Sequence, residues 1–390
     1  MNPEASHGKT KNGSRQHPLR VLQILPSLQG GGVERGTLEV ARAMVARGWE
    51  SIVMSEGGRL VPQLLKEGSE HLAAPVGRKN PWVLLQVFRL IKVCRQRQID
   101  ILHARSRIPA WIAWFAMRCL PAQQRPIFVT TIHGLHSVNW FSSIMARGDK
   151  VIAVSQTASD YVLRHYSSLD PSRLHLVHRG VTASEFPRDY KPDAQWQQQW
   201  YDDFPMLRNA KVVCLPGRIT RRKGHLEFLD LIASMRRIDD RVVGLIVGDW
   251  EPRQASLIKA IHERAAALGI QDYLIWTGHR NDMKSIYAST DLTLSLSNKP
   301  ESFGRSILEP LCLGKRCAGL DHGGVGEVLS QMFPEGKLDP LAGLECWTQQ
   351  CLGLMNETGP LPRANAFLLS ESLNRELNLY EFWVGEQSFP

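Results

Sequence analysis

Short runs of apolar residues alternate with longer amphipathic stretches along most of the chain. The strand-like runs of the first half are Val21–Leu25, Ser51–Ser55, Ile101–His103, Ile127–Ile132, Val151–Val154 and Leu174–Val177. Those of the second half are Val212–Leu215, Val242–Val247, Tyr273–Trp276, Leu292–Leu296 and Arg316–Leu320. Helical stretches lie between them, such as Glu34–Arg47, Pro81–Gln96, His225–Arg236 and Ala255–Leu268. Strands separated by helices indicate parallel sheets, so the pattern predicts an α/β protein with two doubly wound domains.

The break between the two series falls between Gly180 and Lys211, in a stretch that contains Phe186-Pro187, Lys191-Pro192 and a Gln- and Trp-rich segment. We therefore expect a first domain at 19–188 and a second domain at 189–372. The polar residues 1–18 are expected to form a disordered tail. The amphipathic segment at about 373–390 is predicted to pack back onto the first domain. Ligands of such folds bind beyond the carboxyl ends of the strands, so the candidate site residues are sought there.

Charge is unevenly distributed along the 390 residues, whose formal net charge is +9. Residues 1–190 contain 25 Lys and Arg against 13 Asp and Glu, whereas residues 191–390 contain 22 against 25. The positive surplus therefore belongs to the first half alone. This favours one basic face over a uniform nucleic-acid coat, and no nucleic-acid partner is expected.

Neither a membrane span nor a metal site is expected from the sequence. No apolar run reaches about 18 residues, and the first twenty residues hold no apolar core of a secretory signal. We therefore expect a cytoplasmic protein, free or peripheral on the cytoplasmic face of the inner membrane. The seven cysteines form no Cys-x-x-Cys pair, and no Asp-x-Asp triplet occurs.

The strongest chemical signal is a pair of glutamates that follows the run Leu292–Leu296. Glu301 and Glu309 lie eight residues apart, about two helical turns, around a helix start at Ser302–Gly304. The N–H groups of a helix start bind anions, and carboxylates beside a phosphate suit hydroxyl groups. One glutamate would hold a sugar and the other a ribose. An exposed helix with two ordinary glutamates is an equally open interpretation.

A basic loop, Gly217–Gly224, follows the run Val212–Leu215. It places four cations within six residues, among them Arg218 and Lys223. Arg binds phosphate through paired N–H groups and Lys as a point charge, so the loop suits a phosphate clamp. A solvated basic loop is the alternative, but its position at a strand end near Glu301 favours the clamp.

Further candidates follow the strands of the first half. Gly31 and Gly32 belong to a run of three glycines that lets backbone approach a ligand, although the run does not fit G-x-G-x-x-G. His133 ends the run Ile127–Ile132, and a single histidine there is as often structural as functional. Arg105 and Arg107 lie at the same rim, where they suit an anionic acceptor or an ordinary surface role.

In this order and spacing, the motifs resemble those of the family 4 retaining glycosyltransferases with the GT-B fold, from about Leu19 to Leu344. That fold has two Rossmann-like domains facing across a cleft. The sequence departs from the family at Pro310, where Ala is common, and at Arg105, where His is frequent. The matching pieces are Gly30-Gly31-Gly32-Val33-Glu34, Thr131-Ile132-His133-Gly134, Val151-Ile152-Ala153-Val154-Ser155, Arg179-Gly180-Val181, Gly217-Arg218 with Lys223-Gly224, Gly248-Asp249, Thr277-Gly278, Glu301 with Glu309, and Gly323-Gly324-x-x-Glu327.

The resemblance implies transfer of a sugar, with retained configuration, from a nucleotide sugar that we expect to be UDP-linked. Arg218 and Lys223 would hold the donor diphosphate and neutralise the leaving group. Phe303 and Gly304 would add backbone N–H groups, and Gly31 with Gly32 would close the site from the first domain. Cations here do the work of a metal ion, so no cofactor is expected.

Other family roles concern the donor's sugar and nucleoside. Glu301 would bind sugar hydroxyls and Glu309 the ribose. His133 would contact the donor sugar, and Arg280 would lie near the base. No protein nucleophile is implied.

The acceptor is expected to be an envelope glycolipid or a lipopolysaccharide core glycan. The reason is that the segments His103–Arg107 and Met145–Asp149 resemble the corresponding segments of family members that build such glycans. Trp111, Trp114 and Phe115 could then meet an anionic membrane, although a core helix is the favoured interpretation of this segment. Two alternative functions remain open: a non-catalytic protein that binds a sugar nucleotide, and a nucleotide-sugar epimerase of the GT-B type.

Overall fold

A parallel sheet occupies the first half of the chain in the computed structural model, which describes residues 17–356 and 362–387. Within those ranges seven strands lie in the order β3-β2-β1-β4-β5-β6-β7. The strands are β1 (Arg20–Ile24), β2 (Glu50–Ser55), β3 (Glu70–Ala73), β4 (Ile101–Ala104), β5 (Ile127–Ile132), β6 (Lys150–Ala153) and β7 (Leu174–Leu176). The helices between them are α1 (Gly32–Ala46), α2 (Val61–Lys66), α3 (Gln86–Arg97), α4 (Arg107–Cys119) and α5 (Gln156–His165).

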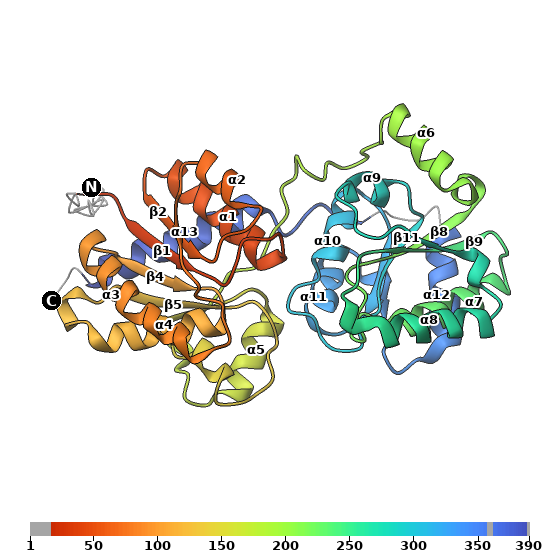
Figure 1. Cartoon of the computed structure of the whole chain (residues 1–390). Helices are drawn as coiled ribbons and strands as arrows, with labels where there is room; N and C mark the ends of the chain where they lie inside the picture. The colour runs from red at the N-terminus through yellow and green to blue at the C-terminus, as the bar shows by residue number, and fades with distance from the viewer. Residues whose placement is uncertain (1–16, 357–361, 388–390) are drawn as a thin grey trace, which may run out of the picture. The chain divides into compact units, whose positions relative to one another are not determined.

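The second half builds another sheet of parallel strands (Figure 1). Across the described residues its order is β10-β9-β8-β11-β12-β13. The strands are β8 (Lys211–Pro216), β9 (Val242–Val247), β10 (Leu274–Trp276), β11 (Leu292–Ser295), β12 (Cys317–Leu320) and β13 (Lys337–Leu338). The helices are α6 (Ala194–Asp203), α7 (His225–Arg236), α8 (Ala255–Ala267), α9 (Met283–Ala288), α10 (Arg305–Cys312), α11 (Gly323–Met332), α12 (Gly343–Asn356) and α13 (Leu369–Gln387).

Burial explains why these segments form strands and helices. Along β9 every residue is buried, which is typical of a parallel strand covered by helices on both faces. Helix α1 instead buries Leu38, Ala41 and Met44, which lie three residues apart, while its opposite side faces water. The period of the apolar pattern therefore matches the observed element in each case.

Both sheets reverse their strand order at an equivalent point. The first sheet reverses between β1 and β4, and the second between β8 and β11. At such a point the loops after the two strands diverge to opposite faces, which opens a crevice where doubly wound folds bind ligands. In the second sheet these loops are the basic loop after β8 and the Glu301 segment after β11.

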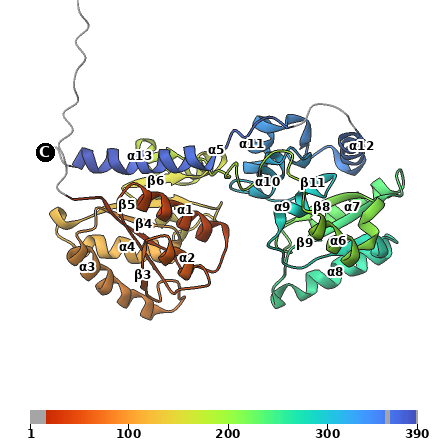
Figure 2. The same ribbon diagram turned by 90° about the horizontal axis from the view of Figure 1, so that it is seen from above.

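Contacts between Cα atoms divide the chain into two compact units. One holds the chain up to Val129 together with the segment from Leu377, and the other holds Thr130–Glu376. In the first unit the α13 residue Tyr380 is buried and hydrogen bonds to His103 of β4, 2.5 Å from Nδ1. Figure 2 shows α13 on one side of β4, with α3 and α4 on the other. The predicted domain limits, 19–188 and 189–372, stay predictions, and the predicted tail lies mostly outside the described residues.

The predicted fold class, α/β with two doubly wound parallel sheets, is confirmed. The pattern missed β3 and β13, a short strand and a two-residue strand at the sheet edges. It also predicted a single helix at Pro81–Gln96, where the chain forms a 3-10 turn, Pro81–Leu85, before α3. No helix in the described ranges is both long and apolar enough to cross a bilayer.

Helix α4 buries some of its aromatic residues and exposes others. Trp111 is buried, and its ring lies 5.4 Å from that of Trp114. The Arg118 guanidinium stacks on the Trp114 ring at 3.3 Å. Phe115 is 38% exposed. The helix packs against α3 and Trp111 belongs to its buried side, whereas the membrane interpretation of Phe115 stays a prediction.

Candidate active site

The loops after β8 and β11 are held together by glycine and by hydrogen bonds. Gly224 has φ +73°, and a Cβ at this position would lie 2.0 Å from the Leu296 carbonyl oxygen. Asn298 donates its backbone N–H to Arg222 O at 2.9 Å and its side-chain N–H to Arg221 O at 2.8 Å. Only glycine allows this approach, so the basic loop and the Glu301 segment lie side by side.

An ion pair joins the two loops at their centre. Lys223 Nζ lies 2.7 Å from Glu301 Oε1, and the Ser297 hydroxyl donates to the same oxygen. Burial raises the pKa of the Glu301 carboxyl, but the Lys223 charge and these hydrogen bonds outweigh burial, so the pKa lies below its ordinary value. Glu301 is therefore ionised at neutral pH.

Beneath this loop lies a histidine that the sequence did not single out. His225 is buried at the start of α7, next to Gly224. Burial first, and the Lys223 charge second, lower its pKa to about 4. The ring is therefore neutral at physiological pH, and the loop's positive charge comes from its Arg and Lys side chains.

The ion pair lines a pocket of about 380 Å³ within the second unit. The lining combines cations, one carboxylate and hydroxyl groups. Arg218 is 80% exposed, and its nearest acidic partner is Glu251 at 3.9 Å. The pocket thus offers positive charge for an anion and a carboxylate for hydroxyl groups. Its lining residues are Gly134, Leu135, His136, Arg218, Thr220, Arg222, Lys223, Ser297, Pro300, Glu301 and Ser302.

The turn before α10 supplies backbone to the same region. Gly304 caps α10 with φ +92°, and the Ser302 hydroxyl donates to His133 O at 2.7 Å. Gly324 donates its N–H to Glu301 O at 2.7 Å, and a Cβ on Gly324 would lie 2.3 Å from the Phe303 Cα. The helix start is therefore fixed on one side by α11 and on the other by the turn after β5.

His133 is oriented by Arg179, whose role the sequence did not assign. Arg179 Nη2 lies 2.6 Å from His133 Nδ1. A guanidinium only donates hydrogen bonds, so Nδ1 must accept and the neutral ring carries its proton on Nε2. The sequence signal that could have identified Arg179 is its place in the Arg179-Gly180-Val181 motif.

Glu327, from the Gly-Gly-x-x-Glu motif, binds the start of α5. Its carboxylate accepts from the backbone N–H groups of Gln156 at 3.0 Å and Thr157 at 3.2 Å, and it contacts His178 Nε2 at 2.6 Å. Burial raises the pKa of Glu327, but these partners lower the pKa by more than burial raises it, so the net shift is downward. A carboxylate at a helix N-terminus is favourable, so Glu327 stabilises the contact between α11 and the start of α5.

Two predicted donor-binding side chains have partners outside the pocket lining. Glu309 is buried and accepts from Arg305 Nε at 2.7 Å. The pKa of the Tyr287 hydroxyl lies well above its ordinary value, because Tyr287 is buried and, second, because the Glu309 charge lies nearby. Arg280 forms two hydrogen bonds with Asp282, at 2.9 and 2.6 Å.

The remaining predicted residues lie in the first unit. The backbone N–H groups of Gly30 and Gly31 both donate to Glu34, the latter at 2.7 Å, and Gly32 begins α1. Arg105 is buried, and its Nε donates to Gln23 Oε1 at 2.9 Å. Arg107 is half-buried at the first position of α4.

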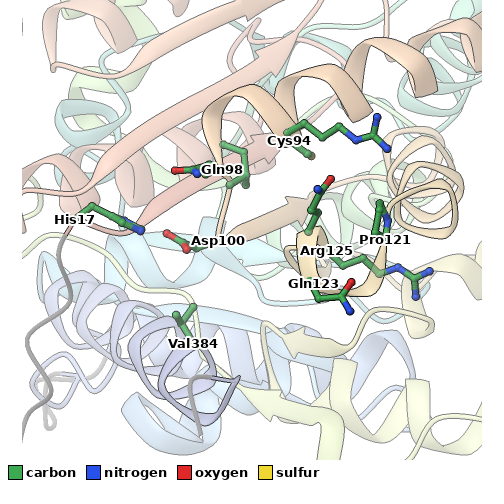
Figure 3. A pocket seen from close by; sticks show the side chains of 11 residues that line it. His17, Cys94, Gln98, Asp100, Pro121, Gln123, Arg125 and Val384 are labelled. Atoms are coloured by element: carbon green, nitrogen blue, oxygen red, sulfur yellow. The ribbon is translucent and has the colours of Figure 1, made fainter. Parts of the chain in front are cut away.

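A larger cavity, about 600 Å³, opens beside the starts of strands β4 and β5 in the first sheet (Figure 3). Asp100 and Arg125 line it, and they precede β4 and β5 respectively. It therefore lies at the amino ends of these strands, whereas doubly wound folds bind ligands at the carboxyl ends. We base the candidate site on the pocket at Lys223 and Glu301.

Comparisons with known proteins show which family the chain resembles and which fold it shares. Residues 30–185 match the family model Glycosyltransferase Family 4, and residues 199–336 match Glycosyl transferases group 1. The N-acetyl-alpha-D-glucosaminyl L-malate synthase of Bacillus anthracis is 24% identical over 324 residues, 79% of this chain and 80% of that protein. The lipopolysaccharide core biosynthesis mannosyltransferase LpsB of Rhizobium meliloti is 21% identical over 234 residues, 60% and 62% of the two chains. The crystal structure of Anabaena Alr3699/HepE with UDP and glucose has a TM-score of 0.75 at 18% identity, covering 93% and 99%.

Proposed function

Because the chain belongs to the family 4 glycosyltransferases with the GT-B fold, we propose that it transfers a sugar from a UDP-linked donor to an envelope glycolipid or lipopolysaccharide core acceptor. The transfer retains the anomeric configuration and uses no metal ion. The observation that carries this proposal is the pocket where Lys223 and Arg218 lie beside the ionised Glu301. A nucleoside-diphosphate sugar combines the two chemical groups that this lining would recognise, a diphosphate and sugar hydroxyls.

Each pocket group has a role in the proposed reaction. Arg218 and Lys223 bind the donor diphosphate and neutralise the charge that develops on it as the glycosidic bond breaks. The backbone N–H groups of Phe303 and Gly304 add to this stabilisation. Glu301 accepts hydrogen bonds from sugar hydroxyls, for which its ionised state is suited. The acceptor hydroxyl attacks from the face that the diphosphate leaves.

His133 donates a hydrogen bond to the donor sugar through Nε2, the nitrogen that carries the proton when Arg179 occupies Nδ1. Replacing Arg179 with Ala removes this constraint on the ring. We expect a lower kcat/KM, because the ring can then turn away from the orientation that points Nε2 at the sugar. An unchanged kcat/KM would contradict the assigned orientation.

Outside the lining, Glu309 is proposed to bind the ribose, Arg280 the base side, and Gly31 with Gly32 the diphosphate. Glu309 and Gly31 already bond within the chain, so donor binding would exchange or share those bonds. The crystal structure of Alr3699/HepE contains UDP and glucose, which supports a UDP-linked donor on this fold.

The acceptor proposal rests on charge and on relatives. Residues 1–190 carry the whole positive surplus of the chain, which suits an anionic glycan or glycolipid. Arg105 and Arg107 are the proposed acceptor contacts, and LpsB is named for lipopolysaccharide core synthesis. We place the reaction in the cytoplasm or at the cytoplasmic face of the inner membrane.

The test is donor turnover with and without acceptor. The purified chain is incubated with UDP-, GDP- and ADP-sugars, with and without extracted glycolipid and with EDTA, and nucleoside diphosphate release is measured. We expect acceptor-dependent release that EDTA leaves intact, and a product whose anomeric signal in NMR matches the donor's. No release with any donor would overturn the proposal, and a new free sugar formed without acceptor would assign an epimerase instead.

Site variants test the residues. Lys223→Ala and Glu301→Gln are expected to lower kcat/KM by about 10²- to 10³-fold, the usual effect of removing one group that stabilises developing charge. Lys259→Ala is the matched control, because it removes an exposed lysine whose partner Glu263 lies 3.7 Å away on the surface of α8. Equal activity in all three variants would refute the site assignment.

A further inference from the structure

The segment 78–97 is basic throughout. No Asp or Glu occurs between Glu70 and Asp100. Half of the surplus of 12 positive charges in residues 1–190 falls in this short segment, on Arg78, Lys79, Arg89, Lys92, Arg95 and Arg97. Half of the surplus therefore lies on α3 or just before the 3-10 turn that precedes it.

The structure places this segment on the outside of the first unit. Pro81–Leu85 forms the 3-10 turn, and α3 continues from Gln86. The inner side of α3 buries Val87, Leu90 and Cys94, and the helix packs on α4. Figure 1 shows α3 and α4 together at the edge of this unit.

The outer side begins with large apolar groups. Trp82 is 73% exposed and Phe88 is 70% exposed, and Leu84 and Leu85 between them are about half exposed. Single exposed hydrophobic residues are common on protein surfaces, but four within seven residues form a patch. We call these four residues the 82–88 patch.

The cations surround the patch along the chain. Arg78 pairs with Glu56 at 3.3 Å, and Arg97 pairs with Glu70 at 2.8 Å. The other four cations of the segment are exposed and make no ion pair within the described part of the chain. Lys79 precedes the patch, and the remaining three follow it on α3.

We propose that the 82–88 patch and its flanking cations form a docking surface for an anionic lipid membrane. A helical segment with aromatic and leucine side chains at one end and Lys and Arg beside them lies in the interface of a bilayer. The apolar groups enter the headgroup boundary, and the cations contact acidic headgroups. This surface is separate from the Trp111 helix that the sequence offered for the same purpose.

Charge complementarity selects a lipid over a second copy of the chain. A symmetric dimer through this patch would bring the four cations that make no ion pair in the described ranges against the same four of the other copy, with no carboxylate in the segment to compensate. An acidic bilayer instead supplies both negative charge and an apolar layer. Each Lys or Arg at such a surface contributes roughly fivefold to binding, so four give several hundred-fold.

The test is vesicle flotation with the full chain. Vesicles of phosphatidylcholine alone are compared with vesicles that contain about 30 mol % phosphatidylglycerol, in low salt and in about 1 M salt, where the Debye length falls to about 3 Å. We expect binding to the acidic vesicles in low salt and at least tenfold weaker binding in high salt. Equal binding to both vesicle types, or none to either, would overturn the proposal.

Two double variants separate the two contributions. Lys79→Ala with Lys92→Ala is expected to weaken binding about 25-fold, and Trp82→Ala with Phe88→Ala about tenfold or more. The matched control is Leu341→Ala with Phe382→Ala, two residues that are 93% and 59% exposed elsewhere. Circular dichroism and the melting temperature check that each variant folds. A control that binds as weakly as the patch variants would overturn the proposal.

Two further readouts keep the outcome unambiguous. Sedimentation of the wild-type chain measures self-association, and a dimer that Trp82→Ala with Phe88→Ala converts to a monomer would assign the patch to a second copy instead. Glu301→Gln is expected to bind vesicles as the wild type does, because it changes the pocket alone. Membrane binding and sugar transfer can therefore fail independently.

Discussion

The Lys223–Glu301 ion pair yields a prediction that connects the pocket to the stability of the fold. The two charged atoms lie 2.7 Å apart, and the side chains are 28% and 20% exposed. At that distance the gross attraction is about 6 kcal/mol at an effective dielectric constant of about 20, most of which the loss of hydration offsets. Because the pair is mostly buried, removing Lys223 leaves a carboxylate without its main partner. We expect Lys223→Ala to lower the free energy of unfolding by about 2 kcal/mol at pH 7.

The loss should depend on pH, and its sign follows from the Glu301 pKa. In the wild type this pKa lies below its ordinary value, so the pair stabilises the fold above about pH 4.5 and stops doing so as pH falls through the folded-state pKa. Without Lys223 the effect of burial dominates and the pKa rises. The stability difference between wild type and Lys223→Ala should therefore be largest at neutral pH and shrink as pH falls below about 4.5.

Thermal and urea unfolding between pH 3 and 7.5 measure this difference. For a unit of this size, about 2 kcal/mol corresponds to a fall in melting temperature of about 4–8 °C. The double variant with Glu301→Gln should lose less than the sum of the single variants, with a coupling of about 1–2 kcal/mol. A difference that does not change with pH, or two additive single variants, would refute the reasoning. Lys259→Ala should melt as the wild type does.

Two further predictions concern packing. Gly324→Ala places a Cβ 2.3 Å from the Phe303 Cα, so it should destabilise the fold by about 1–3 kcal/mol and raise the donor KM. Gly353→Ala is the control, because its Cβ would meet nothing within 4 Å. This control should be neutral or stabilising in thermal melts. Tyr380→Phe removes the hydrogen-bond partner of the buried His103 and should cost about 1–3 kcal/mol in urea unfolding. Its kcat/KM should stay within a factor of two, and a large loss of activity would mean that α13 also shapes the site.

Local pattern was sufficient for the long central strands and for the order of the motifs. Runs such as Val242–Val247 are apolar at nearly every position, and that pattern indicates a covered parallel strand whatever surrounds it. The edge strand β3 was missed because Glu70–Ala73 is partly exposed and its pattern is weak. The 3-10 turn before α3 was missed because Pro81–Gln96 continues the same apolar spacing through both elements.

The partners of the charged residues could not be predicted in the same way. Glu301 and Glu309 lie on one motif, yet Glu301 binds Lys223 from another loop and Glu309 binds Arg305 from its own helix. Sequence spacing gives the second pair, which is an i,i+4 contact, but the first depends on β8 and β11 being neighbours. Ser297 and Arg179 were overlooked because their contacts depend on how the loops fold.

The sequence by itself determined most of the strands and helices, that they form two parallel sheets, and which chemical groups follow the strand ends. Only the tertiary structure decided which groups meet in one pocket and which aromatic segment faces water. Trp111 and Trp82 both lie in apolar stretches near arginines, yet one is buried and the other exposed. The physical reason is that periodicity shows which side chains share a face, whereas burial depends on which other element covers that face.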